Sequence, residues 1–336
     1  MNEKVTIWLP DAKKTTSCGE SMAKTFYDVP LDICLRGELG AGKTTFLQGF
    51  ARALGITEPI TSPTYALEQR YETAKGMSLI HIDLYRLRAK QAKELLSTTD
   101  NHNGIRVIEW PERAERSTAE HPTIFIDLAE EKSGRSLTCM FEDMPLPSKD
   151  DIYQWRKDVL LPKHIVAHCD AVGAFAEKLA RLLMKSGTIA RPQALLRAGQ
   201  VHDLLRFIDF RPGAAPPGMM ETTEETKRHT DWKRRYKDLH HEAACTEFLK
   251  EHGYDGLAAI VLTHGFSRSK ERETIEQELL FYADKRAKMD VIVSLDERFR
   301  DFRKRYGASK ESDQAEIWFR ECKDLEEKLF PEGAPF

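Results

Sequence analysis

A glycine-rich pattern with the spacing of a phosphate-binding loop occupies residues 37–44, which are Gly37-Glu38-Leu39-Gly40-Ala41-Gly42-Lys43-Thr44. It follows the apolar residues 33–35 and precedes an amphipathic segment that begins near Thr45. A strand, a glycine-rich turn and a helix N-terminus direct several backbone N–H groups to one point, where they bind phosphate. Lys43 would add a cation beside the β- and γ-phosphates, and the Thr44 hydroxyl would bind Mg²⁺. The sequence therefore predicts a nucleoside triphosphate site formed by residues 37–45.

Two acidic residues stand at the ends of later apolar runs. Asp83 follows residues 79–82, and Glu109 follows residues 106–108 and precedes Trp110. In open α/β sheets the carboxyl ends of parallel strands face the ligand crevice, so both carboxylates are expected near the phosphates. A carboxylate at that place holds a metal ion or orients the attacking water. The hydroxyl-rich segment 61–65 predicts a further loop near the γ-phosphate.

Four motifs in this order resemble the TsaE (YjeE) family, the small ATPases of bacterial tRNA threonylcarbamoyladenosine synthesis. They are G-E-L-G-A-G-K-T, T-S-P-T-Y, H-I-D-L-Y-R and I-E-W-P-E, within residues 5–141. The resemblance implies the following roles: phosphate and Mg²⁺ binding by Lys43 and Thr44, completion of the Mg²⁺ site by Glu109, catalysis by Asp83, and a place for Trp110 near the nucleotide. It also implies ATP hydrolysis in support of the transferase subunits TsaB and TsaD, which modify the tRNA adenosine beside the anticodon.

The second half of the chain carries histidines and carboxylates suited to a metal site. His202 and Asp203 are adjacent within the predicted helix 193–210. The other candidates come from separate predicted helices and are His168, His241, His264 and Asp284. Helical bundles build metal sites from such residues on facing helices. A ligand set of nitrogen and oxygen atoms suits one or two ions of Fe, Mn, Zn or Ni.

The order H…HD…H…H…D resembles the HD-domain superfamily of metal-dependent phosphohydrolases over residues 160–300. By that resemblance, one ion has the ligands His168, His202, Asp203 and Asp284, and a second has the ligands Asp203, His241 and His264. The resemblance implies that Asp203 bridges the two ions. Arg206, one turn past the pair, is expected to bind a substrate phosphate. Two alternatives remain open, namely His164 instead of His168 and His240 instead of His241.

Composition and length indicate two ordinary globular domains. The chain has 336 residues, of which 41% are hydrophobic and 31% charged, and its net charge is −3. That charge gives no overall attraction to nucleic acid or membrane. No apolar run approaches the roughly 20 residues that span a bilayer, and residues 1–10 lack the pattern of an export signal. Six scattered cysteines without a C-x-x-C pair fit a reducing compartment, so we expect a cytoplasmic protein.

The elements that position these residues follow from the apolar pattern. Strands are predicted at 5–9, 33–35, 64–71, 79–85, 106–110, 123–128 and 137–141. Helices are predicted at 166–185, 193–210, 240–252, 257–264, 274–296 and 313–329, with a loop at 211–218. The proline-containing segment 142–150 is the expected linker. We therefore expect two domains, an α/β P-loop NTPase sheet domain over 1–145 and an all-α HD-type helical bundle over 146–336.

These patterns favour a TsaE-like ATPase joined to a phosphohydrolase whose substrate is a nucleotide or another phosphoester. The alternative hypothesis is an HD hydrolase of nucleotide metabolism or signalling that the P-loop domain gates. A third hypothesis, a docking module without metal, is disfavoured by the presence of all six candidate ligands. The basic run at 227–237 is expected to be a solvated helix face or a surface for phosphate or tRNA.

Overall fold

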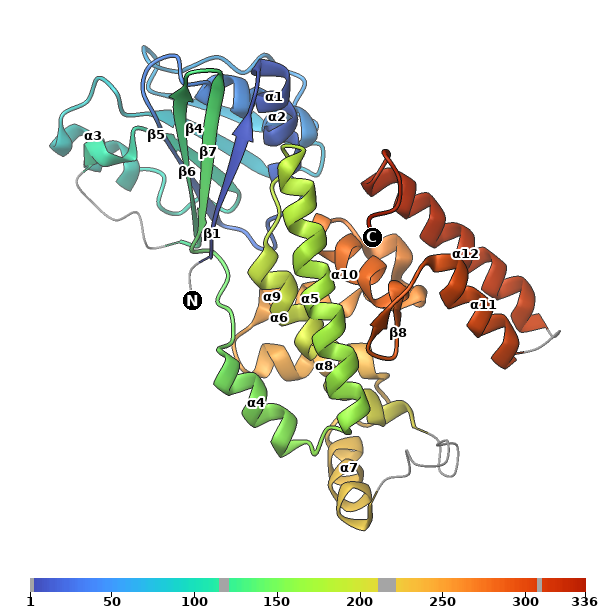
Figure 1. Cartoon of the computed structure of the whole chain (residues 1–336). Coiled ribbons are helices and arrows are strands. Elements are labelled where there is room, and N and C mark those ends of the chain that lie inside the picture. Colours follow the sequence, from blue (N-terminus) through green and yellow to red (C-terminus); the bar gives the residue numbers. More distant parts are fainter. Residues whose placement is uncertain (1–2, 115–120, 211–221, 307–309) are drawn as a thin grey trace. The chain divides into compact units, whose positions relative to one another are not determined.

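The computed structural model describes residues 3–114, 121–210, 222–306 and 310–336, except for the side chains of residues 301–313. The chain separates into two compact units. The sheet unit comprises Asn2–Pro145 and Leu182–Ala190, and the helical unit comprises Leu146–Arg181 and Arg191–Phe336. Figure 1 shows the strands of the first unit and the helices of the second. Nowhere in the described ranges does a helix combine the length and apolarity that crossing a membrane requires.

The sheet unit is built on strands in the spatial order β1-β7-β6-β2-β5-β4-β3. Their bounds are β1 Glu3–Leu9, β2 Leu31–Arg36, β3 Glu68–Glu72, β4 Ser78–Asp83, β5 Ile105–Glu109, β6 Thr123–Glu131 and β7 Gly134–Phe141. The central strands β6, β2, β5 and β4 run parallel, and β1, β7 and β3 pair antiparallel with their neighbours. The carboxyl ends of β2, β4 and β5 therefore meet at one edge.

Helices cover both faces of this sheet, because its central strands bury side chains on both sides. Ile33 and Leu35 of β2 pack in one core with α1 (Ala12–Met22) and α2 (Lys43–Ala53). Cys34 points to the other face and packs with α3 (Ala89–Ser97) and the 3₁₀ helix η1 (Pro111–Ala114). The alternation of side chains along a strand thus gives a sheet with helices on both faces, and the sheet unit belongs to the α/β class that the sequence predicts.

Glycines allow α1 and α2 to cross closely. A Cβ atom on Gly19 would lie 2.0 Å from the carbonyl oxygen of Phe46, and one on Gly49 would lie 1.9 Å from that of Thr16. Neither distance admits a side chain. The crossing fixes α2, whose first residue is Lys43, against α1.

The helical unit surrounds a second core. Its elements are α4 Lys149–Asp158, α5 Lys163–Lys185, α6 Pro192–Val201, η2 Arg206–Asp209, α7 Thr223–Arg235, α8 His241–Glu251, α9 Asp255–Leu262, η3 Phe266–Glu271, α10 Ile275–Arg286, β8 Ala287–Lys288, β9 Val291–Ile292, α11 Leu295–Tyr306 and α12 Lys310–Leu329. Helices α5 and α6 also cross at glycines, since a Cβ atom on Gly199 would lie 2.3 Å from Cα of Gly173. This crossing brings the His168 stretch of α5 beside the end of α6.

The predicted helix 193–210 is wrong in its second part. Helix α6 ends at Val201, and the chain then turns before η2 begins at Arg206. Backbone hydrogen bonds in the turn join residues three apart, from Leu204 N to Val201 O and from Arg206 N to Asp203 O, both 3.0 Å. Buried Leu204, Leu205 and Phe207 continue the apolar pattern through the turn, which hides the helix end in the sequence.

Two other predicted elements also differ from the structure. The predicted helix 274–296 is divided into α10, the hairpin β8–β9 and α11, with Met289 at a φ of 59° in the hairpin turn. The predicted strand 64–71 begins only at Glu68, because the preceding residues form a turn that bonds to Asp83. The basic run at 227–237 lies largely on α7, and the predicted loop 211–218 lies outside the described residues.

Candidate functional sites

The phosphate-binding pattern forms a loop between β2 and α2. Gly37, Gly40 and Gly42 have φ values of 139°, 86° and 103°, which residues other than glycine rarely adopt. Gly42 precedes the helix, and Thr44 and Thr45 lie in its first turn. Lys43 extends over the loop, where its Nζ donates to the carbonyl oxygens of Gly37 at 2.7 Å and Glu38 at 3.2 Å. The geometry is that of a phosphate cradle whose cation lies at its centre.

Two apolar residues of the loop differ in exposure: Ala41 is buried, whereas Leu39 is 66% exposed.

Trp110 follows β5 and lies beside the lysine of the loop, with Lys43 Nζ 4.4 Å from the ring centroid. The backbone of Trp110 has a φ of 58°, a left-handed conformation that directs the chain out of the strand. The structure therefore brings Trp110 to the phosphate loop.

Asp83 and Glu109 face each other in register at the ends of the parallel strands β4 and β5. Asp83 Oδ2 accepts hydrogen bonds from Ser62 Oγ at 3.0 Å and Thr64 Oγ1 at 2.6 Å. The hydroxyl-rich segment 61–65 is therefore joined to the strand-end carboxylate. Glu109 Oε1 lies 2.9 Å from Nε2 of His81, and both residues are buried.

Two residues near this loop have no role assigned from the sequence, although His81 begins the H-I-D-L-Y-R motif. His81 is fully buried and holds Glu109 from the neighbouring strand. Arg135 of β7 approaches the loop so closely that a Cβ atom on Gly42 would lie 2.9 Å from its Nη1. Its Nε atom is buried and has no hydrogen-bond partner among the described residues. A guanidinium at this place adds positive charge beside the cradle, and only the pairing of distant strands reveals it.

Comparison with known proteins indicates the same protein family as the four sequence motifs. Residues 9–137 match the family model of "Threonylcarbamoyl adenosine biosynthesis protein TsaE". The tRNA threonylcarbamoyladenosine biosynthesis protein TsaE of Synechocystis is 41% identical over 121 residues, which are 34% of this chain and 74% of that protein. The Nostoc protein of the same name is 32% identical, over 43% of this chain and 93% of its own length. The chain belongs to the TsaE family.

The family model matches residues in the first half of this TsaE-family chain. The Aquifex aeolicus TsaE is 49% identical over 24% of this chain and 58% of its own length. The crystal structure of Bacillus subtilis YdiB has 25% identity, covers 42% of this chain and 88% of that one, and has a TM-score of 0.35. No family model matches the HD resemblance of the second half.

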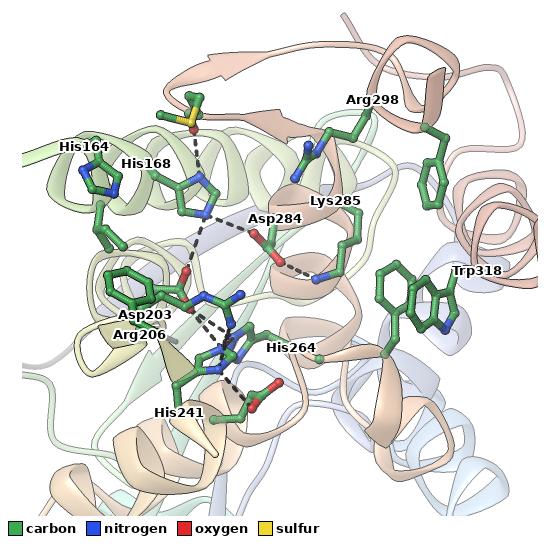
Figure 2. Close-up of a pocket in the computed structure, with 17 residues that line it drawn as sticks. His164, His168, Asp203, Arg206, His241, His264, Asp284, Lys285, Arg298 and Trp318 are labelled. Atoms are coloured by element: carbon green, nitrogen blue, oxygen red, sulfur yellow. Dashed lines mark hydrogen bonds and ion pairs between the residues drawn. The ribbon is translucent and has the colours of Figure 1, made fainter. Parts of the chain in front are cut away.

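The helical unit of the TsaE-family protein brings the six candidate metal ligands together. They come from α5 (His168), the turn after α6 (His202 and Asp203), the start of α8 (His241), the end of α9 (His264) and α10 (Asp284). Their nitrogen and oxygen atoms form overlapping groups within 4.8 Å, and a third group adds Glu242. Figure 2 shows five of these side chains, those of His168, Asp203, His241, His264 and Asp284, converging from separate elements.

Two carboxylates connect the imidazoles. Asp284 Oδ1 lies 3.1 Å from Nε2 of His168 and 3.7 Å from Nε2 of His202. Asp203 Oδ1 lies 3.1 Å from Nε2 of His241 and 3.6 Å from Nε2 of His264. Asp203 Oδ2 lies 3.7 Å from Nε2 of His202. Asp203 therefore stands between the two parts of the cluster, the place expected of a bridging ligand.

All four imidazoles use Nδ1 for a partner outside the cluster. The carbonyl oxygens of Met289, Gly199 and Val261 lie 2.8, 2.8 and 2.6 Å from Nδ1 of His168, His202 and His264, respectively. For His241 the partner is Asp209 Oδ2 at 2.5 Å. The partners of His168, His202 and His264 are carbonyl oxygens, so Nδ1 of these three residues carries the proton. Nδ1 of His241 also lies 2.8 Å from Nη1 of Arg206, a donor, and the Nε2 atoms of all four histidines face the cluster. Outer bonds of this kind orient histidines that ligate metals.

The charge and burial of the cluster suit a cation. Burial raises the pKa of Asp203, but the neighbouring imidazoles outweigh burial and hold it well below its usual value. For Asp284, burial likewise raises the pKa, and Lys285, His168 and His202 lower it further than burial raises it. His202 Nε2 is buried and lacks a hydrogen-bond partner among the described residues. Two ionised carboxylates and an unpartnered imidazole nitrogen are donors that fit a divalent metal ion.

The structure also separates the residues that the sequence left open. His168 belongs to the cluster, whereas His164 lines the adjoining cavity outside the metal-ligand groups. His241 is buried in the cluster, whereas the side chain of His240 is 88% exposed. Asp209 and Lys285 adjoin the cluster although no sequence pattern singled them out, and Glu242, which directly follows His241, belongs to the third ligand group.

A cavity of about 460 Å³ opens onto the cluster. Its cationic lining includes Arg206, Lys285 and Arg298. Arg206 lies beside the predicted second group, with Nη1 3.0 Å from Nε2 of His241. Burial lowers the pKa of Arg206, but Asp203 and the other nearby carboxylates raise it above its usual value, so the guanidinium stays charged. The cavity thus joins a metal-ligand cluster to cations that can bind phosphate.

Proposed function

We propose that the sheet unit binds and hydrolyses ATP with Mg²⁺ in support of threonylcarbamoyl modification of the tRNA adenosine beside the anticodon. The observation that carries the proposal is the phosphate loop at the end of β2, beside strand-end carboxylates on β4 and β5, in a chain of the TsaE family. TsaB and TsaD are its proposed partners. Residues 1–145 are the proposed ATPase domain and 146–336 the second domain.

Each residue of the first site has a proposed task. Thr44 and Glu109 would hold Mg²⁺, which supplies neutralisation of the phosphate charge when bound. Lys43 binds the β- and γ-phosphates, and the loop N–H groups hold the remaining phosphate oxygens. Asp83 orients the attacking water and, through its bonds to Ser62 and Thr64, connects this step to the segment 61–65. Trp110 packs near the nucleotide.

A bacterial strain that lacks its own TsaE tests this function. The full chain should restore threonylcarbamoyladenosine in tRNA, measured by mass spectrometry of tRNA digests, and should bind TsaB and TsaD in a pull-down with ATP. Lys43→Ala should remove both ATP hydrolysis and restoration. Lys90→Ala is the matched control, since this lysine is exposed on α3. Full restoration by Lys43→Ala, or none by the unmodified chain, would contradict the proposal.

We infer a second function for the helical unit, that of a metal-dependent phosphohydrolase of the HD type. The observation that favours it is the cluster of four imidazoles whose Nδ1 atoms are bound outward, together with Asp203 and Asp284. His168, His202, Asp203 and Asp284 would hold one ion, and His241 and His264 a second that shares Asp203. The alternative is that the P-loop domain gates this hydrolase in nucleotide metabolism or signalling.

Bound ions of Fe, Mn, Zn or Ni would supply Lewis-acid activation of water and of the phosphoryl group. Arg206 binds the phosphate oxygens. Asp209 orients His241 through Nδ1, and the carbonyl oxygen of Met289 does the same for His168. The closed cluster, with Asp203 9% exposed and His202 fully buried, keeps the ligands in place.

Metal analysis of the full chain tests the second function. After anaerobic purification, mass spectrometry should find bound transition metal, and Asp203→Asn should release it and abolish phosphate release from a panel of phosphoesters. Asp231→Asn on the exposed face of α7 is the control and should retain both. Full metal content in Asp203→Asn, or none in the unmodified protein, would favour a docking module.

A further inference from the structure

The cavity beside the metal-ligand cluster has a wall of aromatic side chains. Phe266 of η3, Phe299 of α11 and Trp318 of α12 all line it. Trp318 lies outside residues 160–300, the stretch that resembles the HD superfamily. In Figure 2 Trp318 stands on the side of the cavity away from His168, and Lys285 lies between them. The cavity therefore has a ligand cluster at one end and aromatic rings at the other.

The aromatic rings are packed as a rigid surface. Phe266 and Trp318 stack with centroids 4.5 Å apart and an interplanar angle of 16°. Phe299 meets Phe266 edge-on, with centroids 6.4 Å apart. Phe266 also has Phe281 against it at 5.3 Å, so the surface is supported from the core. Phe266 and Trp318 are both half-buried, and each covers one ring face of the other.

Cations lie between this aromatic surface and the metal ligands. Lys285 Nζ stands 4.8 Å from the ring centroid of Phe266 and forms an ion pair with Asp284. Arg206 and Arg298 also line the cavity. A phosphate held by these cations at the cluster would place the group that it carries against the aromatic rings. The volume of about 460 Å³ is within the range of pockets that enclose one small organic ligand.

We propose that the substrate of the helical unit is a phosphate monoester that carries an aromatic group, such as a 5′-mononucleotide, and that Trp318, stacked on Phe266, forms the wall against which its base packs. This inference rests on the proposed phosphohydrolase function. Stacking on such rings is tolerant of base identity, because every base has a π-face. Non-aromatic phosphate esters would bind the same cations without the contribution of the rings.

The reaction on such a substrate is hydrolysis without any redox change. The oxygen of water forms a bond to phosphorus, the bond between phosphorus and the ester oxygen breaks, and that oxygen takes a proton from the water. The products are inorganic phosphate and a nucleoside. Arg206 and Lys285 lie on the side of the cavity where the released phosphate would form.

Kinetics on the Mn²⁺-loaded full chain with the Lys43→Ala substitution test the proposal, because that substitution removes nucleotide hydrolysis at the other site. A 5′-mononucleotide should show a KM at least about tenfold below that of glycerol phosphate, since base stacking contributes a tenfold effect or more. Trp318→Ala should raise the KM for the mononucleotide by about the same factor, with kcat little changed and glycerol phosphate unaffected. Ile317→Ala, at an exposed position of α12, is the control.

Equal KM values for the two esters, or equal effects of Trp318→Ala on both, would overturn the aromatic selection while leaving the phosphohydrolase intact. If neither ester is hydrolysed, the phosphohydrolase function fails, and calorimetric titration of the same metal-loaded protein still decides the aromatic wall. In that case, tighter binding of the mononucleotide than of glycerol phosphate, and loss of this difference in Trp318→Ala, would support binding of the base by the aromatic wall. Equal binding of the two refutes it.

Discussion

The buried imidazole of His81 determines how the carboxylate of Glu109 is held. His81 of β4 lies 2.9 Å from Glu109 of β5 and is shielded from water. Removing this partner frees Glu109 to turn away from the metal, so His81→Ala should lower Mg²⁺-dependent ATP turnover about 10- to 100-fold. Nucleotide binding, followed by fluorescence titration, should persist. His102→Ala is the control, because His102 is equally buried but pairs with Asp32 elsewhere in the sheet. Equal losses of turnover in both variants would indicate general destabilisation.

The sequence revealed residues that end apolar runs but not the residues that orient them. Asp83 and Glu109 stand out because a strand pattern stops at each of them. The role of His81 depends on the pairing of β4 with β5, and that of Arg135 on the approach of β7 to the phosphate loop. Backbone oxygens, such as that of Met289 on His168, have no side-chain signature at all. Positioning contacts across long sequence separations therefore required the structure.

At the scale of elements, periodicity located the strands of the sheet and several helices of the second unit, but not α1, α3 or α4, and not where the helices end. The buried side chains of Leu204 and Leu205 maintain a helical pattern although α6 has ended at Val201. The difference matters to the site, because His202 and Asp203 lie on a turn. Adjacent residues on a helix point about 100° apart. A turn lets both side chains reach one cluster.

The close crossing of α5 and α6 at Gly173 and Gly199 should determine how near the metal ligands His168 and His202 lie to each other. A Cβ atom on Gly199 would come within 2.3 Å of Cα of Gly173, so Gly199→Ala must push the helices apart. We expect a loss of about 1–3 kcal/mol of stability, the usual cost of overpacking, and reduced metal content because His168 and His202 separate. Thermal unfolding and metal analysis measure the two effects. Glu247→Ala on the exposed face of α8 is the control. Unchanged metal content with lowered stability would contradict the positioning role of the crossing.

A buried ion pair joins β2 to β5 and should make the sheet unit sensitive to acid. Arg106 donates to both oxygens of Asp32, at 2.9 and 2.7 Å, and both residues are buried. Burial raises the pKa of Asp32, but His102 and Arg106 lower it further, so the folded pKa lies below the unfolded one. The ionised carboxylate therefore stabilises the fold above the unfolded pKa of about 4, and this contribution is lost as pH falls through the folded pKa.

Asp32→Asn should cost about 3 kcal/mol at neutral pH, the low end of the cost of breaking a buried ion pair, because Asp100 at 2.9 Å remains as the other counter-charge of Arg106. The same variant should lose less stability than the unmodified chain when the pH is lowered below about 4. Calorimetric unfolding across this pH range measures both effects. Glu130→Gln, at the exposed end of β6, should follow the unmodified chain. Parallel pH profiles for Asp32→Asn and the unmodified chain would show that Asp32 does not govern acid sensitivity.

At the scale of the whole molecule, the chain holds two sets of chemical groups in two compact units. The phosphate loop, Asp83 and Glu109 belong to the sheet unit, and the imidazole–carboxylate cluster belongs to the helical unit. No described residue is common to both sets. The sequence predicts a boundary near the segment 142–150, where strand-forming runs give way to helical periodicity, but it does not predict that Leu182–Ala190 belongs to the sheet unit.

Separate sites predict separate losses of activity. Lys43→Ala should abolish ATP hydrolysis and leave metal content and phosphohydrolase activity within about twofold of the unmodified chain, because the hydrogen bonds and ring contact of Lys43 are with Gly37, Glu38 and Trp110 of the sheet unit. Asp203→Asn should release the metal and abolish phosphohydrolase activity, and it should leave ATP hydrolysis within about twofold of the unmodified chain. Saturating ATP or ADP should likewise leave phosphate release from a non-nucleotide ester unchanged, measured on the full chain with and without Lys43→Ala. A severalfold change that depends on Lys43 would instead establish the gated hydrolase, because only an occupied P-loop could then be altering the activity of the helical unit.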